Sequence, residues 1–145
     1  MSTPTMPSPE LYFDTMFAFQ GSAVLKSAIE LDVFTAIGDG ARTPAALAKA
    51  CGAQERGNRI LCAYLTTLGF LTKTGDSYQL TPDSRVFLTR RSPAYLGGTA
   101  EFLYSSEVKG HLERLTETIR RGTPQASIVA DENPAWAQFA RAMVR

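Results

Sequence analysis

The sequence has only two cysteines and one histidine among its 145 residues. Cys51 and Cys62 form no C-x-x-C pair, so the chain lacks both the ligands for a zinc site and the cysteine density of a disulfide framework. We therefore expect two buried, reduced thiols. His111 lies in the charged stretch KGHLER, with no serine or cysteine at a spacing that indicates a catalytic relay. We interpret it as a solvated or hydrogen-bonded surface histidine.

An excess of charge of one sign is also missing. Fifteen Lys and Arg residues face fourteen Asp and Glu residues, which gives a net charge of +1 and disfavours a strongly basic nucleic-acid binder. There is no run of about eighteen apolar residues, and the first nine residues lack the basic start and apolar stretch of a signal peptide. With 44% hydrophobic and 20% charged residues, the composition is that of a globular chain of about one domain. We expect a cytoplasmic protein.

The motifs of common catalytic and cofactor sites are absent. The chain contains no G-x-G-x-x-G, Walker, H-E-x-x-H or G-x-S-x-G pattern. Its glycine clusters, at 38–40 and 97–98, do not follow a strand and open a phosphate-binding helix, so we interpret them as turns. These 145 residues are therefore expected to hold no catalytic residue, no cofactor site and no metal site.

Residues 10–37 form an unusually apolar segment. Ser8 and Pro9 are suitable for a helix start, the length fits one or two helices, and Gly21 is a candidate break or bend. Its apolar residues cover more than one helical stripe, so a second face needs cover. A dimer interface explains this pattern, and the alternative is the central core helix of a monomer. The apolar residues are Leu11, Phe13, Met16, Phe17, Phe19, Val24, Leu25, Ala28, Ile29 and Leu31.

Two helices and a hairpin are predicted next. Thr43 can cap a helix, Pro44 fits its first turn and Gly52 ends it. A second helix follows over 53–69, with inward positions at Ile60, Leu61, Tyr64, Leu65 and Leu68.

Beyond that helix, the runs Phe70 to Lys73 and Tyr78 to Leu80 can form strands around a turn at 74–77. A helix-turn-helix followed by a hairpin is a winged helix, so the fold class is mainly α with a winged helix.

Winged helices commonly read DNA with the second helix of the pair, which makes a DNA-binding transcriptional regulator the alternative function. Acidic residues accompany the basic ones, and the near-zero net charge leaves little counterion release to drive such binding. The residues expected on the exposed face of this helix are Gln54, Glu55, Arg56, Asn58 and Arg59, with Lys73, Arg85, Arg90 and Arg91 beyond it.

Further helices are expected toward the C-terminus. Thr81 and Pro82 cap a short helical segment, and Ser92–Pro93 starts a longer helix that ends at Gly122. Residues 125–133 are expected to form a loop. The apolar stripe expected to lie along the protein surface is Val108, Leu112, Leu115 and Ile119.

A final helix is expected from about Pro134. It has Trp136, Phe139, Ala140 and Met143 on one stripe, and it stops in the middle of its pattern. This indicates that the chain is a fragment of a longer protein.

Four segments carry a family resemblance. They are FAFQGSAVLKSAIELDVFTAI (17–37), TPAALAKACG (43–52), RILCAYLTTLGFL with YQLTP (59–82), and WAQFARAM (136–143). With these segments the chain resembles the N-terminal dimerisation region of plant-type small-molecule O-methyltransferases and their bacterial relatives, which use S-adenosylmethionine. The likeness extends from about Glu10 to Met143.

The resemblance implies a flexible N-terminus (1–9), a winged-helix dimerisation domain (10–100) and linker helices (101–145) that lead to an absent cofactor-binding catalytic domain. It implies a homodimer through the N-terminal helices, with no nucleic-acid or membrane partner. The full-length enzyme would methylate a hydroxyl on a small aromatic molecule, while this chain alone would be inactive. A free-standing ligand-sensing or scaffold module of the same fold is a third interpretation.

The resemblance also places candidate substrate-binding residues. Phe139 and Met143 match the F-x-x-x-M positions that line the acceptor site in the family. Phe19 and Ser22 fall near the place where the first helix of one subunit reaches the partner's pocket. Trp136 is a candidate wall residue.

Overall fold

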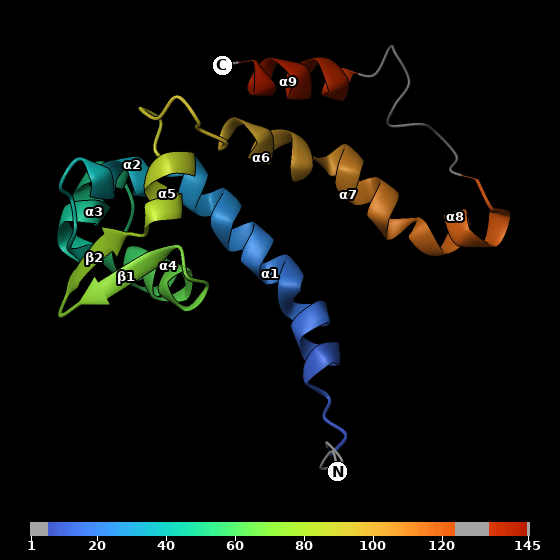
Figure 1. The fold of residues 1–145 in the computed structure, drawn as a ribbon, viewed down its shortest axis with the longest axis horizontal. Helices are drawn as coiled ribbons and strands as arrows, with labels where there is room; N and C mark the ends of the chain where they lie inside the picture. Colours follow the sequence, from blue (N-terminus) through green and yellow to red (C-terminus); the bar gives the residue numbers. More distant parts are fainter. Residues whose placement is uncertain (1–5, 124–133, 145) are drawn as a thin grey trace, which may run out of the picture.

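The computed structural model describes residues 6–123 and 134–144, which are mainly helical with one two-stranded antiparallel sheet. Figure 1 shows a cluster of short helices and the hairpin at one end of a long helix, with further helices extending away from it. In chain order the elements are α1 (Glu10–Glu30), α2 (Val33–Gly38), α3 (Pro44–Cys51), α4 (Glu55–Thr67), β1 (Leu71–Thr74), β2 (Ser77–Leu80), α5 (Pro82–Phe87), α6 (Gly98–Leu103), α7 (Ser106–Glu113), α8 (Leu115–Arg121) and α9 (Pro134–Met143).

The apolar N-terminal segment forms two helices, and they separate at Asp32 rather than at Gly21. Asp32 adopts a left-handed backbone with φ of 56°, a conformation that aspartate tolerates better than most residues. Its carboxylate accepts a hydrogen bond from the Arg90 side chain. Gly21 stays inside α1, where an added Cβ would lie 3.7 Å from the Leu68 side chain. This is an ordinary van der Waals distance, so the packing of α1 beside Leu68 does not require a glycine at this position.

Helix α3 has the termini that its sequence predicts. The Ala46 N–H donates to the Thr43 side-chain oxygen over 3.2 Å, and Pro44 occupies the first turn. Gly52 ends the helix with φ of 62°.

Helix α4 differs from its prediction at two positions. Leu65 is 0% exposed as expected, but Ile60 is 61% exposed, and Leu68 lies at the helix end half in solvent. The face toward the core instead contains Asn58, Cys62 and Leu65. The inward stripe is therefore shifted from the predicted one, because packing against α3 and the hairpin fixes the rotation of α4.

The hairpin pairs Leu71 with Leu80 at one end and Thr74 with Ser77 at the other. Both strands extend one residue further toward the turn than predicted, and β1 begins at Leu71 and not at Phe70. Gly75 in the turn has φ of 60°, which glycine adopts without strain. Arg59 of α4 donates to Asp76 in this turn over 2.9 Å, which connects the turn to the helix.

The core lies between the second half of α1, helices α2 to α4 and the inner face of the hairpin. Tyr78 and Phe34 are its largest fully buried side chains. Such a core is small, so each large-to-small change in it is expected to be costly. The buried residues that form it are Ala28, Val33, Phe34, Ile37, Leu47, Cys62, Leu65, Leu71, Tyr78 and Leu80.

The segment that follows α5 corrects one helix prediction. Thr81 caps α5 as expected, but the next helix begins at Gly98 and not at Ser92–Pro93. The Arg90 N–H donates to the Thr35 hydroxyl over 3.2 Å, and Arg91 pairs with Asp39 over 3.0 Å. These contacts with α2 and its C-terminal end hold the segment in a turn conformation, which overrides the local helix signal.

The predicted long amphipathic helix is three helices, with Ser105 capping α7 through the Val108 N–H. Leu112, Leu115 and Ile119 were expected to lie against the protein surface, but all three are exposed. We call these three residues the α7–α8 stripe. Figure 1 shows α7 and α8 extending away from the hairpin and its neighbouring helices, which is why this stripe has no cover within the described chain.

Helix α9 begins at Pro134 as predicted and packs against α6. The loop predicted over 125–133 lies outside the described residues.

The two cysteines differ in their surroundings. Cys62 is fully buried, and this burial raises the pKa of its thiol to about 11. Cys51 is only partly buried, and burial raises its thiol pKa, with Asp32 adding to the effect. Both thiols are therefore protonated near neutral pH and poorly reactive.

Leu65→Ala tests the orientation of α4. The substitution leaves a cavity in the core, so the free energy of unfolding should fall by about 2–5 kcal/mol. Ile60→Ala is the matched control on the same helix, and it should change stability by less than about 0.5 kcal/mol because the side chain is exposed. Urea unfolding followed by circular dichroism measures both. A larger loss for Ile60→Ala than for Leu65→Ala would contradict the described packing.

Candidate functional site

The first half of α1 carries a continuous apolar surface. We call it the α1 apolar face, and its side chains are all exposed in the single chain. Phe13 and Phe17 stack with ring centroids 5.8 Å apart, and Tyr12 meets Phe13 edge-on at 5.3 Å. These contacts order the rings along the helix before any partner binds. The α1 apolar face consists of Leu11, Tyr12, Phe13, Met16, Phe17 and Phe19.

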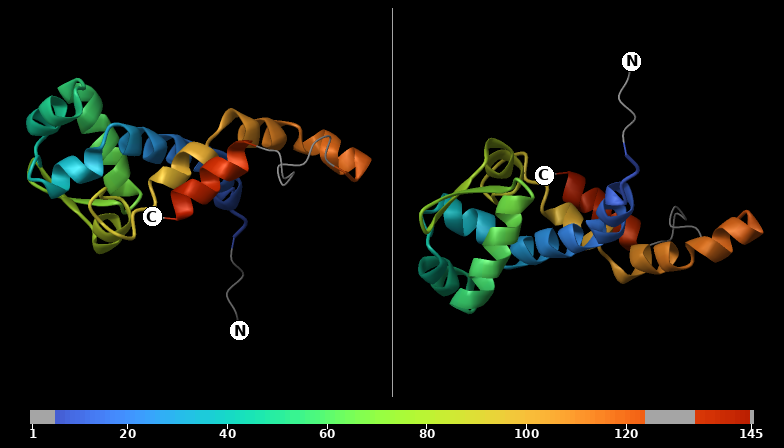
Figure 2. Two further views of the ribbon diagram at one scale, coloured as in Figure 1. Left: turned by 90° about the horizontal axis from the view of Figure 1, so that it is seen from above. Right: turned by 90° about the horizontal axis from the view of Figure 1, so that it is seen from below.

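The second half of α1 is anchored in the chain's own core. Ala28 is fully buried, and Val24, Leu25 and Ile29 pack against the core residues. Both views in Figure 2 show the N-terminal part of α1 projecting from the cluster formed by α2 to α5. One helix is thus a core element at its C-terminal end and an uncovered surface at its N-terminal end.

Helices α6 and α9 lie side by side and connect the C-terminal region to α1 (Figure 2). The Phe102 ring of α6 lies 4.9 Å from the Phe139 ring of α9, centroid to centroid. Helix α6 also contacts α1. The position of α9 therefore depends on α6 and on an aromatic contact with it.

A cavity of about 440 Å³ lies where α1, the segment before α6 and α9 meet. Lys26 pairs with Glu30 on its α1 side, and the Arg90 guanidinium lies 5.7 Å from the Tyr95 ring centroid. The residues that line it are Lys26, Ile29, Glu30, Arg90, Tyr95, Gly97, Gly98, Ala100, Glu101 and Arg141.

Two of these lining residues are held by local contacts. The Arg90 pKa is raised, first by its hydrogen bond to Asp32. The Tyr95 side chain packs against Gly97, where an added Cβ would clash with it at 2.1 Å. The cavity is therefore lined by positively and negatively charged side chains and by a tyrosine ring that is held in place.

The predicted substrate-binding residues lie on two helices. Phe19, 64% exposed, and Ser22 are on α1, while Phe139 and Met143 are on α9. Met143 is 59% exposed, and Phe139 is partly buried against Phe102. The side chain of Trp136 lies outside the described residues.

Arg141 lies between Phe139 and Met143 in the sequence and lines the cavity. Lys26, Tyr95 and Arg141 also line the cavity but were not among the predicted site residues. In the sequence each of them is a single charged or aromatic residue, and no local pattern distinguishes such a residue from one on a solvated surface.

The predicted DNA-reading face of α4 is altered by the tertiary structure. Asn58 was expected to be exposed, but it is 1% exposed and its amide is buried toward the core. Arg59 donates to both Asp76 and Glu55, and these partners raise its pKa. Ion pairing leaves less free positive charge on this face for phosphate contacts.

Neither a metal-ligand cluster nor a membrane-spanning helix is found among the described residues. These residues contain no group of three or more His, Cys, Asp and Glu side chains that could hold a metal ion. His111 lies partly exposed on α7. Among the helices that are described, none has the length and apolar character needed to cross a bilayer.

The two strands that the structure describes form an antiparallel hairpin with a two-residue turn. A nucleotide-type cofactor site needs a strand, a glycine-rich turn and a helix in succession, so these strands do not fit S-adenosylmethionine.

Comparison with known proteins gives a family match. The model of the O-methyltransferase dimerisation domain matches residues 13–90, which is more than half of the chain. A relative from Streptomyces glaucescens, the tetracenomycin polyketide synthesis 8-O-methyl transferase TcmO, is 39% identical over 112 residues. The match covers 74% of this chain and 32% of TcmO, so the chain spans about a third of that relative's length.

Solved structures of O-methyltransferase proteins also superimpose on this chain. A protein from Nostoc punctiforme assigned as an O-methyltransferase superimposes with a TM-score of 0.88 at 44% identity, over 95% of this chain and 43% of that one. An O-methyltransferase family protein from Burkholderia thailandensis superimposes with a TM-score of 0.73 at 31% identity, over 97% and 43% of the two chains.

Proposed function

The chain belongs to the O-methyltransferase dimerisation domain family, and on that premise we propose that it forms the homodimerising, acceptor-pocket part of an S-adenosylmethionine-dependent O-methyltransferase. The acceptor is a hydroxyl on a small aromatic molecule. The α1 apolar face is the observation that carries the dimer, because no described element of the chain covers it. The α3–α4–hairpin unit acts as a winged helix that supports α1 within residues 10–100.

The energetics favour an interface larger than the α1 apolar face alone. Its six side chains are about half exposed. Burying the exposed part of each side chain contributes roughly 1 kcal/mol to the free energy of association, or about 12 kcal/mol for two chains. Association costs about 4–15 kcal/mol. The α1 apolar face by itself therefore offsets this cost only narrowly. The α7–α8 stripe supplies further exposed apolar surface, and we assign it to the same interface.

Phe13→Glu with Phe17→Glu tests the dimer. Two carboxylates in a buried apolar interface are costly to desolvate, so the double variant should sediment as a monomer at tens of micromolar, where the unmodified chain sediments as a dimer. Analytical ultracentrifugation measures the mass.

Ile60→Glu is the matched control, since it places a carboxylate at an exposed apolar residue outside α1. This variant should remain dimeric. A monomeric unmodified chain with α1 helical would count against the proposal, as would loss of the dimer in the control alone.

The acceptor pocket is proposed to form between α9 and α1. Phe139 and Met143 supply an aromatic ring and a thioether, which suit a flat apolar acceptor. Phe19 and Ser22 reach the pocket from the partner's α1, and Trp136 contributes to the wall. The cavity lined by Arg141 lies between α9 and α1 of the same chain, and none of the four proposed residues with described side chains lines it, so the shared helices are the only support that it gives this location.

Phe139→Ala and Met143→Ala test the pocket in the full-length enzyme. Each should raise KM for a hydroxylated aromatic acceptor by about tenfold with a smaller effect on kcat, because these groups bind substrate without taking part in proton or methyl transfer. Phe87→Ala removes a partly exposed ring on α5 and should leave KM unchanged. Methyl transfer from labelled S-adenosylmethionine gives both constants. Equal effects in all three variants would indicate a general loss of stability instead.

Residues 101–145 are proposed to be linker helices that lead into the cofactor-binding domain. The chain spans 32–43% of the three relatives named above, which supports a further domain in the complete protein. The reading frame after Arg145 should encode a strand, a glycine-rich turn and an acidic residue at the end of the next strand. Sequencing the gene decides this. A stop codon directly after Arg145 would instead favour a free-standing ligand-sensing or scaffold module.

A further inference from the structure

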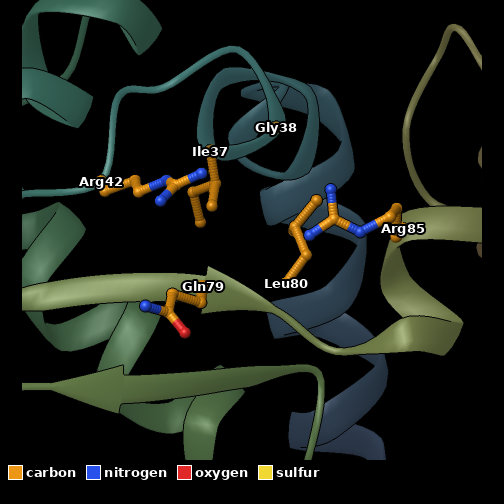
Figure 3. Close-up of a pocket in the computed structure, with 6 residues that line it drawn as sticks. All are labelled: Ile37, Gly38, Arg42, Gln79, Leu80 and Arg85. Atoms are coloured by element: carbon orange, nitrogen blue, oxygen red, sulfur yellow. The ribbon is translucent and has the colours of Figure 1, made fainter.

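A second cleft, of about 220 Å³, lies between α2, β2 and α5. It is formed by other elements than the proposed acceptor pocket. Figure 3 shows the Arg42 and Arg85 side chains entering it from opposite sides, with their guanidinium groups directed toward each other and Gln79 below them. Ile37 and Leu80, both nearly fully buried, form its apolar wall.

The backbone fixes the position of Arg42 beside the hairpin. Its carbonyl oxygen accepts from the Tyr78 N–H over 2.8 Å, and the preceding Ala41 N–H donates to Ala36 over 2.9 Å. Tyr78 is fully buried and precedes Gln79 on β2. Arg42 and Gln79 are thus held on one side of the hairpin by main-chain contacts.

Arg85 is fixed from the other side by the capped helix α5. The Thr81 hydroxyl caps the helix through the Ser84 N–H. The Ser84 hydroxyl donates to the Phe70 carbonyl over 2.6 Å, and the Thr89 hydroxyl donates to the Arg85 carbonyl over 2.8 Å. Tertiary contacts therefore bring the two arginines to one cleft, although they are far apart in the sequence.

The charge in this cleft is unbalanced. No carboxylate lines it, and neither Arg42 nor Arg85 forms an ion pair with a carboxylate in the described part of the chain. The neighbouring Arg90 and Arg91, in contrast, pair with Asp32 and Asp39. Both guanidinium groups are exposed to solvent, so their donors are free to bind an anion that enters the cleft.

We propose that this cleft binds the phosphoryl group of a small molecule or a free phosphate ion. A tetrahedral oxyanion offers oxygens in different directions, so it can accept from two guanidinium groups on opposite sides and from the Gln79 amide at once. A planar carboxylate offers only two oxygens. The volume is below the range of about 300–1,000 Å³ typical of drug-sized ligands, which favours a compact group.

Titration with inorganic phosphate at constant ionic strength tests the site. Amide chemical shifts of Arg42, Gln79 and Arg85 should move together and saturate, whereas acetate should move them less. Arg42→Gln and Arg85→Gln should each weaken phosphate binding about tenfold, since each removes charge-assisted hydrogen bonds. Arg56→Gln is the matched control: Arg56 is exposed on α4, does not line the cleft and should be replaceable without effect.

Thermal unfolding provides a second measurement. Phosphate should raise the Tm of the unmodified protein and of Arg56→Gln, and it should raise the Tm of the Arg42→Gln, Arg85→Gln double variant much less. In phosphate-free buffer the double variant should be about as stable as the unmodified protein, because neither arginine forms an ion pair in the described part of the chain.

A phosphate monoester such as phenyl phosphate distinguishes the two sources. Tighter binding than inorganic phosphate assigns the site to a phosphorylated small molecule, and equal binding assigns it to phosphate itself. Absence of saturable shifts in the millimolar range would overturn the proposal. An equal loss of binding in the Arg56→Gln control would also overturn it.

Discussion

The structure depends on one constraint: the two halves of α1 lie in different surroundings, the second half in the chain's own core and the first half outside it. Its second half buries Ala28 and packs Val24, Leu25 and Ile29 onto the chain's own core. Its first half carries rings and aliphatic side chains that no other described element covers. Because the helix is continuous from Glu10 to Glu30, the anchored half holds the uncovered half rigidly away from the core. A rigid apolar helix loses little conformational entropy when a second chain covers it. This small loss makes such a helix suitable as a dimerisation element.

The remaining elements of the N-terminal part hold α1 in place. Gly21 of α1 faces Leu68 at the end of α4, and Asp32 turns the chain so that α2 can enter the core. Arg90 and Arg91 connect the segment after α5 to α2 and its C-terminal end. These ion pairs are exposed and each contributes about 0–1 kcal/mol, so their main effect is to select one arrangement of the segment rather than to stabilise the fold.

The same connections shape the C-terminal side. A turn at residues 89–97 places α6 against α1, and the Phe102–Phe139 contact then positions α9. The elements that carry the proposed acceptor residues are therefore attached to the dimerisation helix itself. In a dimer, assembly of α1 and formation of the acceptor pocket would depend on each other.

Local signals in the sequence determined much of the fold. Thr43, Pro44 and Gly52 bound α3, Thr81 caps α5, and the glycine turn closes the hairpin, because each of these interactions joins residues only a few positions apart. The excess of apolar residues on α1 also indicated that it needs cover beyond one face, and the family resemblance could be stated from four segments. Tertiary structure alone decided that Asn58 is buried, that Ile60 and the α7–α8 stripe face solvent, and that the helix expected at Ser92–Pro93 begins at Gly98. It also brought Arg42 and Arg85 to one cleft. The physical reason is common to these cases: helix rotation, helix breaks and side-chain convergence are set by contacts between residues distant in the sequence, and the free energy of those contacts exceeds the local preference of about 1 kcal/mol or less per residue.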